Sequence, residues 1–399
     1  MRTRVLATAA VLALLLSACA DDDDGTDATA TKSPSAAATS AAPTTLTFQV
    51  DVDAKHATIP TSYYAMFPKA LSARPGDTVS FALVDTGEPH TVAFGATVDK
   101  VFAFRKANPK AEEGPPEEKQ IPELFPDGPG DVFQAAAQPC VLPAGAPPVT
   151  DFTKPCANTK PIEFTGLDQL FTSGWMGPDA PFTFVVAAAA VPGTYNYLCQ
   201  LHGPDMGGTL TVVAPGATVP SPAEVKAKGE AEKAALTAAL APAYAALAAA
   251  KGPRDAVAGT FAPPQGDVFV QGQANAFGPA EITVPVGGKV TWNVLGPHTI
   301  AFNAPADAVG VRIVGPDGVA HRNEKAEAPA ASPGQKFGPQ GPSGDPVDGG
   351  RWNGEGYRSS GILLAFEKPL AYSITFTKAG TYKYLCQIHI DMEGTVKVG

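Results

Sequence analysis

Alternating apolar and polar residues mark several segments of this chain as strands with one buried face. In "TLTFQVDV", residues 45–52, every second residue is apolar, which is the pattern of a half-buried strand. Residues 73–95, "ARPGDTVSFALVDTGEPHTVAFG", predict a turn, a strand, a loop and a second strand. Gly and Pro number 40 each, which favours short strands and many turns over long helices.

The second half of the chain repeats the first. Residues 284–303, "VPVGGKVTWNVLGPHTIAFN", match residues 73–95, and residues 379–389, "AGTYKYLCQIH", match "PGTYNYLCQLH" at 192–202. Three pairs share one offset of 211: Gly76 with Gly287, Val79 with Val290, and Phe81 with Trp292. Two copies predict two domains of one fold, at 46–214 and 261–399, and not a solenoid.

The segments around the repeats predict other structure. Residues 215–260 are rich in Ala, Glu and Lys, which are strong helix formers, so we expect a helical linker. Pro222 suits a helix start, whereas Pro242 is expected to kink or break the helix and so to leave two short helices. Each repeat carries a Gly- and Pro-rich insert, at 96–180 and 304–360, where we expect loops with short helices.

The N-terminus predicts export. Residues 1–18 combine two arginines with an apolar run that is short for a membrane span, as in a signal peptide. "LSAC", which ends at Cys19, resembles the bacterial lipobox, in which the cysteine is lipidated. We therefore expect a lipid anchor on the outer face of the cytoplasmic membrane, and a disordered acidic tether over 19–45. The alternative is an ordinary cleaved signal followed by an unrelated cysteine.

The net charge bears on possible partners, and two further cysteines bear on a possible disulfide. The net charge is −10 and no basic patch is present, which argues against nucleic acid as a partner. Cys140 and Cys156 lie in the first insert with fifteen residues between them. In an exported protein such a pair is expected to form a disulfide. A pair of soft metal ligands is the weaker alternative, because no His or Met stands between them.

Three rare residue types recur twice in one order. Each repeat supplies a His, then Cys-x2-His, and then a Met a few residues later. The first set is His90, Cys199, His202 and Met206, and the second is His298, Cys386, His389 and Met392. A thiolate, two imidazoles and a distant thioether form the electron-transfer type of copper site. The sequence therefore predicts two copper ions, one in each repeat.

The spacing agrees with that chemistry. Each Cys follows an alternating strand, "TYNYL" or "TYKYL", and the next strand begins soon after the Met. One hairpin loop thus carries three ligands, and a rigid sandwich brings the upstream His to them. Zinc would leave the Met unexplained and would need a fourth hard or thiolate ligand. A cysteine nucleophile would explain neither the Met nor the duplication.

These motifs resemble the cupredoxin family, of the plastocyanin and amicyanin kind. The resemblance lies in "EPHTVAF" and "GPHTIAF" together with "YNYLCQLHGPDM" and "YKYLCQIHIDM". It implies two Greek-key β-sandwiches, each with a blue type 1 copper and single-electron transfer. The chain departs from small cupredoxins in its long His-to-Cys separations, 109 and 88 positions. The loops to the axial Met also differ, with three residues after His202 and two after His389.

The same residues favour a carrier over an enzyme. Copper oxidases and nitrite reductases bind further copper through extra His pairs, and no His-x-His or His-Cys-His occurs here. His56 and His321, the remaining histidines, stand in polar stretches and are expected at the surface. Redox proteins of unknown identity are the expected partners. Copper capture and delivery, or a second copper site between subunits, are the alternatives.

Overall fold

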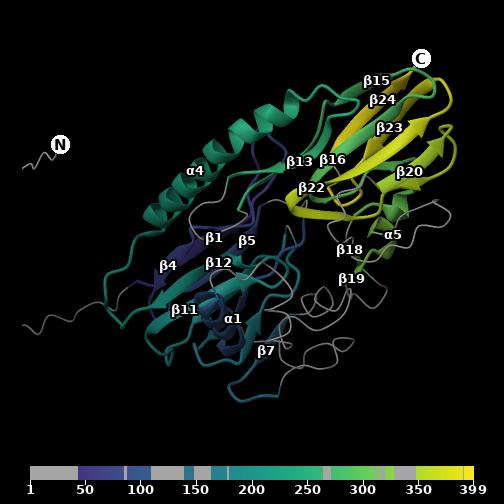
Figure 1. The fold of residues 1–399 in the computed structure, drawn as a ribbon. Helices are drawn as coiled ribbons and strands as arrows, with labels where there is room; N and C mark the ends of the chain where they lie inside the picture. Colours follow the sequence, from purple (N-terminus) through teal and green to yellow (C-terminus); the bar gives the residue numbers. More distant parts are fainter. Residues whose placement is uncertain are drawn as a thin grey trace, which may run out of the picture. The chain divides into compact units, whose positions relative to one another are not determined.

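The computed structural model describes residues 44–84, 88–108, 139–147, 163–177, 179–263, 271–310, 312–314, 320–327, 347–389 and 391–399. Strands are their main regular structure, and the larger sheets form two sandwiches, as the alternating segments predict (Figure 1). Among these residues, no helix combines the length and the apolar character needed to cross a bilayer.

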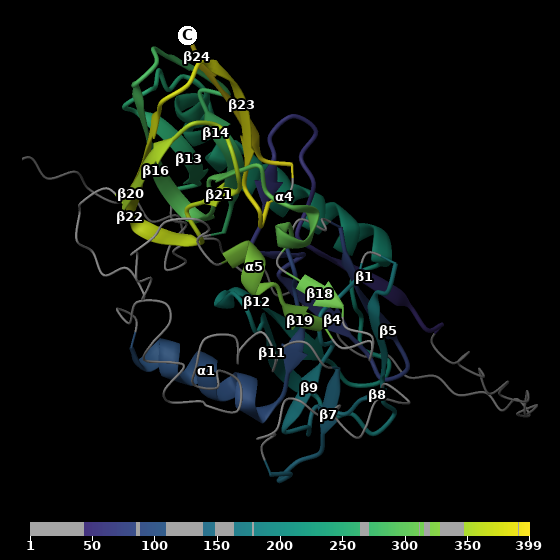
Figure 2. The same ribbon diagram turned by 90° about the vertical axis from the view of Figure 1, so that its right-hand side faces the viewer.

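The first sandwich is built from two sheets of the first repeat. One sheet has the order β3 (Met66–Phe67), β1 (Thr47–Val52), β5 (Thr78–Leu83), β10 (Phe182–Val186), β8 (Glu163–Phe164). The other has the order β4 (Ala70–Ala73), β12 (Gly203–Val212), β11 (Gly193–Cys199), β6 (Ala93–Phe94), β9 (Leu170–Thr172), β7 (Cys140–Leu142). Helix α1 (Ala96–Ala107) packs against β11 and β6 (Figure 2).

The second sandwich repeats this plan. Its first sheet has the order β2 (Thr61–Ser62), β14 (Gln273–Gly278), β13 (Ala256–Phe261), β16 (Lys289–His298), β22 (Leu363–Phe376), β20 (Val347–Trp352). Its second has the order β15 (Glu281–Val284), β24 (Glu393–Val398), β23 (Gly380–Leu385), β17 (Ala301–Phe302), β21 (Arg358–Ser359). The second insert also holds η1 (Ala306–Ala308), the hairpin of β18 (Arg312–Val314) and β19 (Ala320–Arg322), and α5 (Glu324–Glu327).

Corresponding apolar positions fill the two cores. Phe81 in the first sandwich and Trp292 in the second are fully buried, and each ring contacts a tyrosine of the strand that leads to the ligand cysteine. The rings of Phe81 and Tyr197 lie 5.2 Å apart, and those of Trp292 and Tyr384 lie 5.3 Å apart. Burial of large aromatic side chains is a major source of stability, so each cysteine is carried by a strand that is fixed in its core.

Helix α4 (Pro222–Ala248) forms most of the predicted linker. Pro222 lies in its first turn, and Ser221, the residue before the helix, forms a capping box with Glu224. This box satisfies the backbone N–H groups of Ser221 and Glu224. The expected break at Pro242 is wrong, because α4 continues through it. Buried Leu240 and Leu247 anchor the helix on both sides of the proline, and this packing outweighs the loss of one backbone hydrogen bond.

Two further expectations need correction. The linker does not extend to residue 260, because β13 begins at Ala256 and pairs with β16. The first insert contains strands as well as loops and a helix, since β7, β8 and β9 all join the sheets of the first sandwich. Pairing with an existing sheet edge satisfies backbone groups that short segments with little periodicity cannot satisfy alone.

The two sandwiches are in direct contact. Strand β2 of the first repeat pairs with β14 at the edge of a second-repeat sheet, with Ser62 opposite Gln273 and Thr61 opposite Ala274. Helix α4 contacts β1 and β3 of the first sandwich and β13 and β14 of the second (Figure 1). Residues 44–399 form one compact unit.

Candidate metal centres

The structure brings three predicted ligands of the first repeat together, and we call His90, Cys199 and His202 the first site. Cys199 ends β11, His202 lies in the turn before β12, and His90 lies between β5 and β6. The Cys199 Sγ atom lies 3.4 Å from Nδ1 of His202 and 4.0 Å from Nδ1 of His90. The two Nδ1 atoms are 3.2 Å apart, so three donor atoms converge on one point.

The second repeat forms the same arrangement, the second site, from His298, Cys386 and His389. The Cys386 Sγ atom lies 3.5 Å from Nδ1 of His389 and 3.8 Å from Nδ1 of His298. The two Nδ1 atoms are 3.0 Å apart. All three residues are buried.

A backbone amide contacts each sulfur from the strand connection that carries the upstream histidine. The N–H groups of Thr91 and Thr299 each donate to the cysteine Sγ atom at 3.4 Å. Each threonine hydroxyl also accepts a hydrogen bond from the N–H of the residue after the cysteine, Gln200 or Gln387. These bonds fix the sulfur relative to the histidine segment, and a hydrogen bond to sulfur tunes the electronic properties of a bound metal.

The charge balance of both sites favours thiolates. Burial alone would raise the pKa of Cys199 and Cys386, but the neighbouring histidines outweigh burial and hold the pKa of both thiols well below the usual value. A thiolate is the form that binds a metal ion. Two imidazoles that present Nδ1 to a thiolate therefore make a donor set that fits copper.

The predicted axial methionines are buried in the cores that also hold the cysteines. Met206 in β12 is buried in the same apolar cluster as Cys199, and Met392, just before β24, is buried in the cluster that holds Cys386. The backbone of Met392 is tied to the ligand loop, since its N–H donates to His389 O and its carbonyl accepts from Cys386 N, both at 2.9 Å. Their role as ligands stays a prediction.

The outer nitrogen of the upstream histidine has different partners in the two sites. In the first site, Nε2 of His90 lies 3.1 Å from Oδ2 of Asp53. In the second site, Nε2 of His298 lies 3.0 Å from the side-chain amide of Gln273. Burial lowers the pKa of both imidazoles, but Asp53 and the Cys199 thiolate outweigh it and raise the pKa of His90 to about 10. The pKa of His298 stays below its usual value.

The strand registers show how this difference arises. Val52 pairs with Leu83 in the first sandwich and Ala258 pairs with Val294 in the second. Asp53 and Gly259, the next residues, both have positive φ, 61° and 74°. At Gly259 a Cβ would lie 2.0 Å from Nε2 of His298. The second repeat therefore has no room for a side chain where the first has its aspartate.

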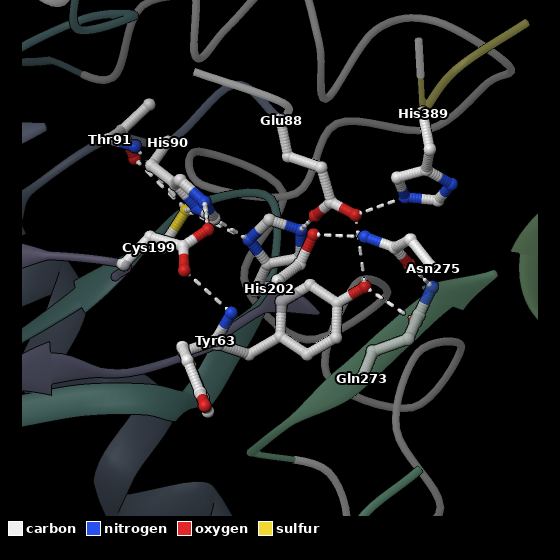
Figure 3. A network of polar contacts seen from close by, with 12 residues as sticks. Tyr63, Glu88, His90, Thr91, Cys199, His202, Gln273, Asn275 and His389 are labelled. Atoms are coloured by element: carbon white, nitrogen blue, oxygen red, sulfur yellow. Dashed lines mark hydrogen bonds and ion pairs between the residues drawn. The ribbon is translucent and has the colours of Figure 1, made fainter. Parts of the chain in front are cut away.

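A glutamate links the two sites. Oε1 of Glu88 lies 2.5 Å from Nε2 of His389, and Oε2 lies 3.5 Å from Nε2 of His202. Figure 3 shows the carboxylate between the two rings. Burial would raise the pKa of Glu88, but the surrounding histidines, His389 first, hold it well below the usual value. Glu88 is therefore a carboxylate shared by ligands of both sites.

The other predicted residues are three cysteines and the two remaining histidines. Cys19 and Cys156 lie outside the described residues, so the lipid anchor and the disulfide stay predictions. Cys140 is buried at the start of β7. His56 is partly buried, and its Nδ1 accepts hydrogen bonds from Ile59 N at 2.9 Å and Thr58 N at 3.2 Å. His321 lies in β19.

Sequence patterns alone did not identify Asp53, Gln273 or Glu88. One signal was present for Glu88, since the repeats read "EPH" and "GPH". Gly296, which precedes His298 by two residues as Glu88 precedes His90, has a φ of 109°. Because the first repeat has a charged residue at the position where the second has a glycine, this position indicates a role that belongs to the first repeat alone.

Comparisons with known proteins find similar solved structures but no matching family. No family model and no curated protein matches the chain. Among solved structures, amicyanin from Paracoccus versutus is similar at 24% identity over 31% of this chain and 73% of that chain, with a TM-score of 0.15. Reduced auracyanin from Roseiflexus castenholzii is similar at 19% identity over 42% of this chain and 98% of that chain, with a TM-score of 0.24.

The chain contains two β-sandwiches. Each holds one His-Cys-His set, in which the cysteine and the second histidine come from one loop and the first histidine from another strand connection.

Proposed function

We propose that this chain is a type 1 copper protein that carries single electrons through two mononuclear sites. The observation that carries the proposal is the repeated donor set, in which two Nδ1 atoms and a thiolate converge in each sandwich. A backbone N–H on each sulfur and a buried methionine in the same core complete both sets. Soft nitrogen and sulfur donors of this kind select copper over magnesium or calcium.

The ligands of the first ion would be His90, Cys199 and His202 with Met206 as the axial donor, and those of the second His298, Cys386 and His389 with Met392. When bound, copper would supply the one-electron change between Cu(II) and Cu(I). The residues supply rigidity. The apolar core of each sandwich holds its cysteine strand. Hydrogen bonds of Nε2 to carboxylates keep Nδ1 of His90 and of His389 directed at the sulfur. Ligands that move little between the two oxidation states keep the reorganisation energy of electron transfer low.

The location is part of the proposal. We place the chain outside the cytoplasmic membrane, anchored by lipid on Cys19, with Cys140 and Cys156 joined as a disulfide. Its partners are other redox proteins. We favour a carrier over an oxidase because the sequence contains no His-x-His or His-Cys-His motif for a further copper centre.

Metal content and colour test the function. The full chain should bind two copper ions and show a thiolate charge-transfer band from each. Cys199→Ala should remove one coloured site and leave the other, because the two thiolates belong to separate cores. Loss of both bands or of neither would contradict two separate sites. A chain that binds only Cu(I) and stays colourless would instead indicate copper delivery.

A further inference from the structure

Glu88 connects the two ligand sets without belonging to either. Its carboxylate contacts Nε2 of His202 at 3.5 Å and Nε2 of His389 at 2.5 Å (Figure 3). The Nδ1 atom of each ring faces a cysteine sulfur. Nε2 of His389 is hydrogen-bonded to the carboxylate, and Nε2 of His202 forms an ion-pair contact with it. One short chain of side-chain contacts therefore runs from Cys199 to Cys386.

The two sites differ in their access to solvent. The side chain of His202 is 22% exposed, whereas that of His389 is 3% exposed and that of Glu88 is 8% exposed. An external redox partner can therefore reach the imidazole edge of His202. The corresponding edge of His389 is covered, and the group that contacts it belongs to the first repeat.

A second set of contacts joins the sites beside Glu88. The Tyr64 hydroxyl lies 3.2 Å from Oε1 of Glu88 and 2.8 Å from Oε1 of Gln273, the residue that contacts His298. The Tyr64 ring also packs on His202, with ring centroids 4.6 Å apart. Both histidines of the second site are thus connected to side chains of the first repeat.

The backbone around this network is held by regular structure. Strand β2 pairs with β14, which carries Gln273, and the next polar residue of β14, Asn275, donates from Nδ2 to Ser62 Oγ at 2.7 Å. Asn275 N also donates to Pro60 O at 2.8 Å. These bonds fix the segment that carries Tyr64 relative to the second sandwich, and a fixed separation is what efficient tunnelling of an electron requires.

We propose that Glu88 joins the two sites into one electron-transfer unit, in which an electron enters near His202 and passes to the second site through His202, Glu88 and His389. This rests on the proposed function, because both sites must hold a redox-active metal. In each passage one site is oxidised by one electron and the other is reduced by one electron. No covalent bond forms or breaks, and the Nε2 protons stay between the rings and the carboxylate.

Glu88→Gln is the sharpest test, because it keeps the shape and the cover over His389. The two histidines contact different oxygens of the carboxylate, and the amide nitrogen that replaces one of these oxygens cannot accept a hydrogen bond. The experiment injects less than one electron per fully oxidised, copper-loaded full chain by a radiolytic pulse. The two charge-transfer bands, assigned with Cys199→Ala and Cys386→Ala, then report how the electron redistributes.

In the parent chain we expect a redistribution phase whose rate does not depend on protein concentration. Glu88→Gln should slow this phase by about tenfold or more, the usual scale for loss of a hydrogen-bond partner of a metal ligand. The matched control is Glu355→Gln, which alters an exposed glutamate paired with Lys378 and should leave the rate unchanged. An unchanged rate in Glu88→Gln, or a parent phase that scales with concentration, would overturn the proposal.

A measurement on the metal-free chain tests the link independently of copper. With ¹⁵N-labelled histidine, the Nε2 proton of His389 should give a resonance protected from exchange with water in the parent and in Glu355→Gln. Glu88→Ala should lose that protection, and retained protection would refute the contact. If the chain binds no coloured copper, the proposed function fails while this result still stands. If both sites are coloured but Glu88→Gln transfers electrons at the parent rate, only the link fails.

Discussion

At the scale of single residues, the two sites have the same three donor residue types but different neighbours. Asp53 accepts hydrogen bonds from the N–H groups of Ala54 and Tyr63, both at 2.6 Å, and contacts His90. The amide of Gln273 takes its place in the second site. A buried carboxylate on a ligand histidine makes that ligand more basic, so the first site is built to favour the more positive oxidation state of a bound metal.

Asp53→Asn should therefore raise the reduction potential of the first site. The negative charge beside His90 stabilises the oxidised form, and its loss removes that stabilisation. We expect a rise of tens of millivolts, where about 59 mV corresponds to a tenfold change in a one-electron equilibrium. Spectroelectrochemical titration in a Cys386→Ala background measures the first site alone.

The reciprocal change provides the control. Gln273→Glu adds a carboxylate at the matching position and should lower the potential of the second site, measured in a Cys199→Ala background. In the parent chain the first site should have the lower potential, and this difference would give electrons a preferred direction. Equal potentials in both sites, or no shift in Asp53→Asn, would contradict this account.

Asp77 makes folding stability depend on pH. Burial would raise its pKa, but hydrogen bonds from Arg74 and from Leu46 N together lower the pKa below the usual value. A lowered pKa means that the stabilisation is complete above the unfolded-state pKa of about 3.9 and is lost as the pH falls through the lower folded-state pKa. Asp77→Asn should lower the free energy of unfolding at neutral pH by on the order of 1–3 kcal/mol. Urea unfolding of metal-free protein from neutral pH into acid checks this. If the free energy of unfolding of the variant falls as steeply with pH as that of the parent, Asp77 does not contribute to the pH dependence of stability.

At the scale of elements, helix α4 fastens the two sandwiches to each other. Its apolar residues are buried against both, since Leu236 packs with Tyr63 and Phe67 of the first repeat and Leu240 packs with Ala262 and Ala274 of the second. Lys233 on the same helix pairs with Asp51 at 2.5 Å. The helix therefore acts as a structural brace between the sandwiches and not as a loose linker.

Leu240→Ala should destabilise the chain through this brace. Leu240 is fully buried, so truncation leaves a cavity and should lower the free energy of unfolding by about 2–5 kcal/mol. Leu167→Ala makes the same chemical change at a side chain that is 57% exposed and should have little effect. Denaturant titration compares the free energies of unfolding of the two variants. Equal losses would show that burial of Leu240 in α4 does not stabilise the chain more than an exposed leucine does.

At the scale of the whole molecule, the two repeats form one unit because groups of the first repeat contribute to the second sandwich and to its site. Strand β2 extends a sheet of the second sandwich, and Glu88 covers a ligand of the second site. Interfaces between domains of one chain are often polar and mobile, but a paired strand, a buried helix face and a shared carboxylate hold this one. The two sandwiches therefore form one structural unit that contains both His-Cys-His sets.

Membrane attachment also belongs to this scale. Cys19→Ala should move the protein from the membrane fraction to the soluble fraction, because one lipidated cysteine would be its anchor. Fractionation of cells that express the parent and the variant measures this, with Cys199→Ala as a control that keeps Cys19. A Cys19→Ala chain that remains with the membrane would exclude the lipid anchor.

Sequence alone determined the features that depend on local pattern. Alternation predicted β1, the repeat predicted two domains of one fold, and the order His, Cys, His predicted the three residues that come together in each one. The donor residues can be predicted because their rare types recur in the same order in both repeats. Strands can be predicted from the sequence because their alternating pattern involves residues that are close together along the chain. The helix start at Pro222 was readable for the same reason.

Only the tertiary structure decided how the two repeats meet. Continuation of α4 through Pro242 depends on leucines buried against distant strands, and packing overrides the local preference. Asp53, Gln273 and Glu88 gain their roles from contacts between segments 37, 25 and 301 positions apart. No local periodicity encodes such a contact, because it exists only once two folded surfaces exclude water between them.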